Sequence, residues 1–237
     1  MRSKRCGLGV LTGTLTVGVA GCGAPSTPTS NTTPTAVATA TATPAPLDTD
    51  TVTVVTTGVG TWQLVTIPVA LLHNDATRHG AEEVVVHFST RSAAGRALGS
   101  LDSAAVNLAP GETLPVAADC TDACNSAASV SVTVTVGLWT AMTGASFTAT
   151  GVAYRCGTGA CGGGHGQGDV TGTLTTSRLR QGAALVAFAA CTGSGGAIVG
   201  GGLLQTQWQG GSSGTVEIPV IVNRAPAACR IGASTGW

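Results

Sequence analysis

The feature that most constrains the fold is a strict alternation of valine with hydroxyl side chains over residues 130–136. Valine occupies positions 130, 132, 134 and 136, and serine or threonine occupies the positions between them. Successive side chains of a β-strand point to opposite faces, so the pattern places valine on one face and hydroxyls on the other. The stretch therefore predicts a strand with one face on a core and the other in water.

Other stretches share this strand-like character, namely 51–56, 62–67 and 83–88. Between strands lie turn signals, of which residues 108–113 are the clearest, because Pro110 presets φ and Gly111 supplies the positive φ of a type II turn. The chain holds 35 glycines and only 9% charged residues, which suits short strands joined by tight turns better than long amphipathic helices. We therefore expect an all-β fold of antiparallel sandwiches.

The second part of the body repeats features of the first at an offset of about 100 residues. Phe188 matches Phe88, Gly195 matches Gly95, and the stretch 214–220 echoes 111–116. Two small β-sandwich domains, at 50–142 and 143–237, account for these matches. A single larger sandwich is the alternative.

The N-terminus has the organisation of an export signal. Arg2, Lys4 and Arg5 form a positive segment, and the apolar run over residues 8–20 is too short to span a bilayer as a stable helix. Residues 1–21 are therefore expected to be a signal peptide.

The end of this segment, residues 19–22, reads Val-Ala-Gly-Cys and resembles the bacterial lipobox, an aliphatic residue and two small residues before a cysteine. The resemblance implies lipid attachment at Cys22, cleavage before it, and a protein held on the extracytoplasmic face of the cell membrane. More than one acyl chain makes such attachment stable. The alternatives are an ordinary cleaved signal and a retained anchor.

A tether is expected to follow Cys22. Residues 23–49 contain nine threonines and five prolines with almost nothing to bury, so they cannot recover the entropy lost on ordering. We expect residues 22–49 to be a lipid anchor and a disordered linker.

The first body domain loosely resembles the FxLyD-type domains of bacterial surface lipoproteins, which are small immunoglobulin-like sandwiches. The resemblance rests on Asn74 after an apolar strand, Phe88 before a loop with Gly95, and the stretch 108–112. Residues 89–91 read Ser-Thr-Arg, which departs from the motif. The resemblance therefore bears on fold more than on function, and it implies a domain without catalytic activity.

Six cysteines follow Cys22, and an even number in an exported protein indicates a disulfide framework. Six cysteines allow fifteen pairings. Proximity favours Cys120–Cys124 and Cys156–Cys161, which leaves Cys191–Cys229. A redox or metal role for Cys120 and Cys124 is the alternative, although their spacing is not that of a CxxC site.

The histidines offer one candidate site. His73, Asp75 and His79 could supply imidazoles and a carboxylate to a metal or to acid–base catalysis. The structural interpretation is that Asn74 and Asp75 shape a turn, that His79 is solvated, and that His87 lies on a polar strand face. His165 lies in a glycine-rich stretch that lacks the Lys-Ser/Thr of a P-loop, which indicates a plain loop.

The tryptophans and the charge of the chain also bear on its function. Trp62, Trp139 and Trp208 lie at strand-like segments and are expected in the core or at its rim. Removal of the signal leaves 8 arginines against 11 acidic residues, which does not favour nucleic-acid binding.

The sequence thus predicts a non-catalytic binding or structural module of the cell envelope without a cofactor or metal. Its partners are the membrane, through Cys22, and an envelope protein or the cell wall. An extracytoplasmic enzyme or metal-handling protein using His73, Asp75 and His79 is the alternative, and a passive spacer is a third interpretation.

Overall fold

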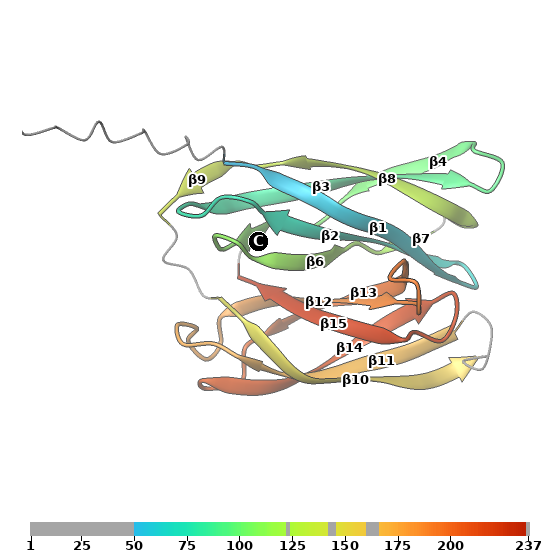
Figure 1. Ribbon diagram of the computed structural model, residues 1–237. Helices are drawn as coiled ribbons and strands as arrows, with labels where there is room; N and C mark the ends of the chain where they lie inside the picture. Colours follow the sequence, from blue (N-terminus) through green and yellow to red (C-terminus); the bar gives the residue numbers. More distant parts are fainter. Residues whose placement is uncertain (1–49, 122–123, 142–145, 160–165, 236–237) are drawn as a thin grey trace, which may run out of the picture. The chain divides into compact units, whose positions relative to one another are not determined.

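The computed structural model describes residues 50–121, 124–141, 146–159 and 166–235, and these residues form an all-β fold without helices (Figure 1). Within them, no helix is long and apolar enough to cross a membrane. The signal peptide, Cys22, the tether, His165 and Trp237 lie outside the described residues, as does the expected domain boundary near residue 142.

Residues 50–141, the first half of the body, form two antiparallel sheets. One has the strand order β1-β2-β6, with β7 paired to β2; the other has the order β4-β3-β8, with β5 and β9 also paired to β3. The strands are β1 (Val52–Trp62), β2 (Val65–Asn74), β3 (Gly80–Ser92), β4 (Ala97–Asp102), β5 (Val106–Leu108), β6 (Thr113–Ala117), β7 (Cys120–Thr121), β8 (Ala127–Thr135) and β9 (Leu138–Thr140).

Residues 146–235, the second half, form one sheet with the order β10-β11-β14-β13-β12-β15. The strands are β10 (Thr148–Gly159), β11 (Gly166–Thr175), β12 (Ala184–Thr192), β13 (Ile198–Gln207), β14 (Ser213–Val222) and β15 (Ala228–Ser234). In the described ladders, β13 and β14 pair only at Gly200–Val222 and Gly201–Ile221.

The two halves repeat one topology. The order β1-β2-β6 of the first half corresponds to β10-β11-β14 of the second, and β4-β3-β8 corresponds to β13-β12-β15. In the second half the two three-stranded groups are joined by the short β13–β14 ladder. The repeat that the sequence indicates therefore has a counterpart in the strand order.

The two halves repeat at an offset of 101 residues in the structure, one residue more than the offset of the Phe88–Phe188 and Gly95–Gly195 matches. The turn after β3 is closed by hydrogen bonds between Ser92 and Arg96 and from Gly95 to Ser92, and the turn after β12 has the same bonds between Gly193 and Ala197 and from Gly196 to Gly193. The offset is therefore 101, so the partner of Gly95 is Gly196, and both have positive φ. Because a shift of one residue reverses the face of a strand, Phe188 corresponds to His87 rather than to Phe88.

Each half contributes to a hydrophobic core, and β12 takes part in two. Phe88, Leu72 and Leu114 belong to the first core, together with Val186 and Phe188 of β12. The alternate β12 residues, Leu185, Ala187, Ala189 and Cys191, belong to the second core with Trp208 and Ile218. A strand buried on both faces reads as a continuous apolar run, as β12 does.

Glycines allow the β1-β2-β6 sheet to approach the second half closely. A Cβ atom on Gly60 would lie 2.0 Å from the backbone oxygen of Ile221, and one on Gly58 would lie 2.7 Å from Cβ of Ile198. Backbone atoms cannot move aside as a flexible side chain can, so any side chain at residue 60 would force the sheets apart. These strand glycines therefore serve close packing rather than turns.

Two asparagine side chains also join the halves. Asn223 accepts a hydrogen bond from the backbone N–H of Thr61 (2.8 Å) and donates to the carbonyl of Val59 (2.7 Å). The side chain of Asn107 donates to the carbonyl of Thr235 (2.7 Å). Residues 46–237 accordingly form one compact unit, and a division into two domains at residue 142 stays a prediction.

The structure confirms a strand in the alternating stretch and corrects the strand predicted at 62–67. Residues 130–135 of the alternating stretch lie in β8, where the valines are half-buried against the first core and the serine and threonine side chains are exposed. The stretch 62–67 is not one strand, because Gln63 and Leu64 form the turn between β1 and β2. Gln63 has a φ of 53° and Leu64 is 66% exposed, as suits a hairpin turn.

Candidate functional site

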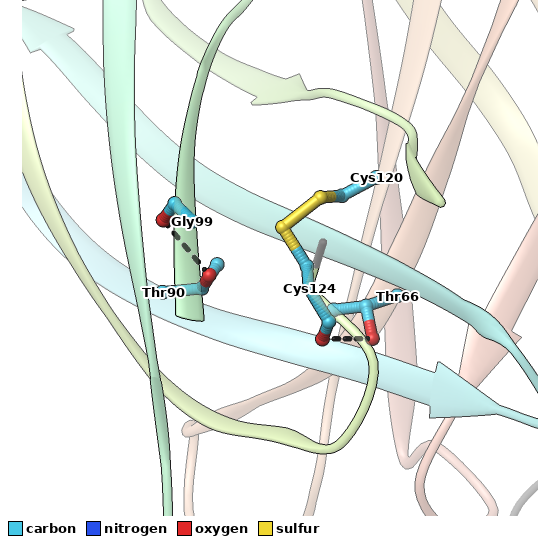
Figure 2. The surroundings of a disulfide bond; sticks show 5 residues. All are labelled: Thr66, Thr90, Gly99, Cys120 and Cys124. Atoms are coloured by element: carbon cyan, nitrogen blue, oxygen red, sulfur yellow. Dashed lines mark hydrogen bonds between the residues drawn. A yellow bond between two sulfur atoms is a disulfide. The ribbon is translucent and has the colours of Figure 1, made fainter. Parts of the chain in front are cut away.

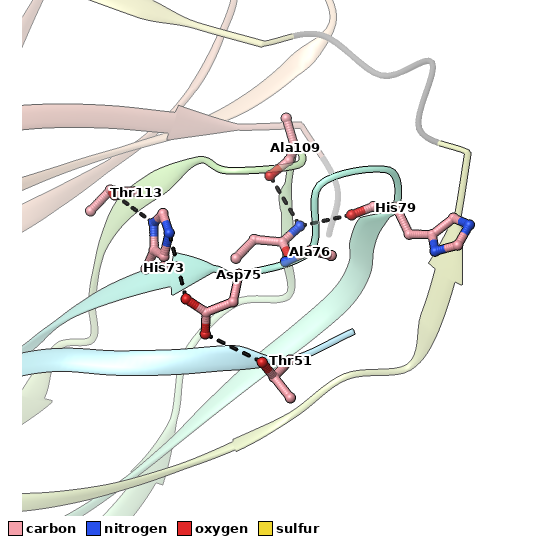
Figure 3. Close-up of polar contacts among 8 residues, drawn as sticks. Thr51, His73, Asp75, Ala76, His79, Ala109 and Thr113 are labelled. Atoms are coloured by element: carbon pink, nitrogen blue, oxygen red, sulfur yellow. Dashed lines mark hydrogen bonds and ion pairs between the residues drawn. The ribbon is translucent and has the colours of Figure 1, made fainter. Parts of the chain in front are cut away.

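The histidine site expected from the sequence is not assembled. His73 Nε2 lies 3.6 Å from Asp75 Oδ1, but His79 pairs with Asp50, at 3.0 Å from Nδ1 to Oδ2. Figure 3 shows the imidazole of His79 pointing away from His73 and Asp75. Nowhere in the described part of the chain do three His, Cys, Asp or Glu side chains converge as metal ligands.

The side chain of Asn74, between His73 and Asp75, links two loops by hydrogen bonds. Its buried side chain donates to the carbonyls of His79 and Ala109, each at 3.0 Å, and accepts from the backbone N–H of Ala76 at 3.0 Å (Figure 3). Glu112 N–H donates to the Ala109 carbonyl at 3.1 Å, and Gly111 has a φ of 68°. The type II turn is thus confirmed, and Asn74 has a structural role here.

Glu112 completes this turn with its carboxyl group. Its Oε2 accepts a hydrogen bond from the backbone N–H of Ala109 at 2.6 Å. Burial disfavours the charged form and raises the pKa of Glu112, and the Ala109 hydrogen bond offsets part of that rise. The folded protein therefore binds this proton more tightly than the unfolded chain does.

Replacement of Glu112 by glutamine should stabilise the fold in a pH-dependent manner. With a raised folded pKa, the wild-type contribution is fully favourable below the unfolded pKa and is lost as pH rises through the folded pKa. Glutamine keeps an acceptor for Ala109 and has no charge to desolvate, so we expect a melting temperature higher than wild type by up to about 3 °C at pH 7 and a vanishing difference near pH 3. Thermal melts across this range, with exposed Glu217→Gln as the control, measure it. A difference that is independent of pH would contradict this explanation.

The third described histidine joins three strands. His87 on β3 has Nδ1 2.6 Å from Asp102 Oδ1 on β4 and Nε2 2.9 Å from Thr135 Oγ1 on β8. The prediction that His87 lies on a polar face is confirmed, but no local pattern indicates its two partners, which come from distant positions in the chain. Asp102 is 61% exposed, so water screens this network, and we interpret it as a cross-strand link.

Two disulfide bonds are described, and both pairs were predicted, the first because its cysteines are close in sequence and the second as the pair that remained. Cys120 and Cys124 are bonded in the first half, where the hydroxyl of Thr66 donates to the Cys124 carbonyl at 3.0 Å (Figure 2). Cys191 and Cys229 are bonded at directly opposite positions of β12 and β15. Cys156 is also disulfide-bonded, and its expected partner, Cys161, lies outside the described residues.

A groove of about 450 Å³ lies between β1 and β2 of the first half and β12, β13 and β15 of the second. We call it the junction groove, and its lining includes Val55, Leu71, Ala190, Ile198, Ala228 and Arg230. Its size falls in the range of small-molecule pockets. It was not expected from the sequence, because its walls come from segments more than 100 residues apart.

The junction groove lies beside the glycine contacts. At Gly58 and Gly60, β1 lies in direct contact with the second half. At Val55 the register of β1 against β2 shifts by one residue, which marks a β-bulge. A bulge bends its strand and redirects the extra side chain. Val55 is accordingly 56% exposed, although it is aliphatic, and it lines the groove.

The chemistry of the junction groove is simple. Arg230 is the one ionisable side chain among its described lining residues, because Cys229 is held in a disulfide. A guanidinium does not lose its proton in proteins, so these residues can bind but offer no general acid or base. No protein-family model and no curated protein matches the sequence.

Proposed function

We propose that this chain is a lipid-anchored, extracytoplasmic module of the bacterial cell envelope that binds a ligand or partner and has no catalytic activity. The observation that carries the proposal is the presence of structural disulfides in a body that follows an export-like N-terminus. Disulfides persist in oxidising compartments and are rare in the cytosol. The Cys120–Cys124 and Cys191–Cys229 bonds therefore support export, which the N-terminal segment suggests independently.

The absence of catalytic activity is supported by how the candidate residues are used. His73 and His79 face different carboxylates, and Asn74 between them is occupied by backbone hydrogen bonds. The junction groove offers apolar walls and one cation. Binding needs no more than that, whereas acid–base catalysis needs a group that exchanges a proton near neutral pH.

Replacement of Cys22 by alanine tests the anchor. The wild-type chain should incorporate labelled palmitate and sediment with the membrane, because a thioether-linked lipid needs the Cys22 thiol. Cys22→Ala should remain as an uncleaved precursor or appear in the medium, with no label. Cys6→Ala, which alters a cysteine of the signal segment, is the matched control and should behave as wild type. Recovery of the alanine variant as a membrane-bound mature species would show that the anchor lies elsewhere.

A further inference from the structure

We propose that the junction groove binds a single-chain amphiphile with a terminal carboxylate, the chemistry of a fatty acid. This inference rests on the proposed binding function and names its ligand class. The apolar walls would hold the hydrocarbon chain, and the Arg230 guanidinium would hold the carboxylate.

The walls favour a hydrocarbon chain. Val55, Leu71 and Ile198 supply aliphatic surface, and Ala190 and Ala228 keep the floor open because their side chains are small. Ala190 and Ile198 also belong to the first core, so this part of the groove is anchored in packed structure. Covering the exposed side chain of Val55 removes apolar area from water, which favours association.

Arg230 supplies the positive charge of the junction groove. It lies directly opposite Ala190 in the β12–β15 ladder, and its neighbour Cys229 packs against the second core. Because side chains alternate along a strand, Arg230 and Ala228 both point to the groove side of β15. Among the described residues, no carboxylate lies within ion-pair distance of Arg230, and no acidic residue lines the groove. An arginine fork pairs well with a carboxylate, by two parallel hydrogen bonds.

The dimensions favour one chain. An open groove of about 450 Å³ suits a single medium-length chain, whereas a two-chain phospholipid exceeds it. Thr56 and Thr192 also line the groove, and the Thr192 hydroxyl already donates to the Ala228 carbonyl at 3.4 Å.

Decanoate titration of the full-length chain carrying Cys22→Ser, which has no acylation site, tests the proposal. Calorimetry should give one site per chain, and methyl NMR shifts should centre on Val55, Leu71 and Ile198. Arg230→Gln should weaken decanoate binding by roughly tenfold, since it removes the charge-assisted hydrogen bonds. Arg155→Gln, an exposed arginine on β10 outside the groove, is the matched control and should bind as the parent chain does. Neutral 1-decanol should bind more weakly than decanoate and should not respond to Arg230→Gln.

A second pair of variants tests the apolar part. Ala228→Trp should fill the groove and abolish binding, whereas Ala227→Trp, at an exposed neighbour outside the groove, should not; melting curves check that both fold. Absence of decanoate binding, or equal binding by the Arg230→Gln variant, would overturn the proposal. The decanoate measurement is independent of the anchor test, because the titrated chain carries Cys22→Ser and has no lipid at residue 22. If Cys22→Ala is recovered as a membrane-bound mature species while decanoate still binds, only the anchor at Cys22 is refuted.

Discussion

Replacement of Phe188 by alanine should reduce the free energy of unfolding by about 3–5 kcal/mol, which is the usual cost of emptying a buried phenylalanine site. The ring is fully buried and lies on the face of β12 that packs against the first half. The neighbouring glycines hold the backbones of the two halves in contact, so the walls cannot collapse far into the space left by the ring. The cost should therefore be near the upper end of this range.

Urea denaturation of the purified chain measures the Phe188→Ala effect, and the topological repeat provides the control. His87 occupies the equivalent position on β3, but its face of the sheet is exposed to water. His87→Ala should therefore change stability by less than about 1 kcal/mol. Similar losses for the two variants would mean that Phe188 is not held between the halves as the structure has it. Phe88→Ala, inside the first sandwich, should cost about as much as Phe188→Ala.

The contrast between His87 and Phe188 explains what sequence alone can predict. The alternation in β8 and the apolar run of β12 both reflect burial, and the alternation is a pattern that predicts a strand from the sequence. The outer face of β12 is apolar because the first half covers it, whereas His87, Ser89 and Arg91 on the outer face of β3 are half-buried or exposed in the described structure. That difference depends on how distant segments pack, so the match of Phe88 to Phe188 put the second ring on the wrong face.

The same limit applies to glycine. Gly111 was recognised because Pro110 precedes it in a known turn pattern, and the turn is present. Gly58 and Gly60 lie inside strands, where the atoms of Ile198 and Ile221 that face them leave no room for a side chain. The junction groove lies beside these contacts, and neither its walls nor the position of Arg230 has a local signal. Sequence periodicity reports which face of a strand is covered and carries no information on what covers it.

Removal of the Cys191–Cys229 disulfide by a double alanine replacement should destabilise the protein by about 4 kcal/mol. The two cysteines are 38 positions apart, and a cross-link over that distance removes far more freedom from the unfolded chain than a short one does. Cys191 is fully buried in the second core, where alanine also leaves a small gap. The loss should therefore reach or exceed the value from chain entropy alone.

The Cys120–Cys124 disulfide supplies the internal comparison for this measurement. Its cysteines are only 4 positions apart, so its removal by a double alanine replacement should cost about 2 kcal/mol. Urea denaturation under oxidising conditions gives both values, and the parent chain treated with reductant should lose at least as much stability as the Cys191/Cys229 variant. An equal or larger loss for the short loop would contradict an origin in unfolded-state entropy. The strands β12 and β15 would then owe their pairing to the packing of Ala189 and Ile231 in the second core rather than to the covalent link.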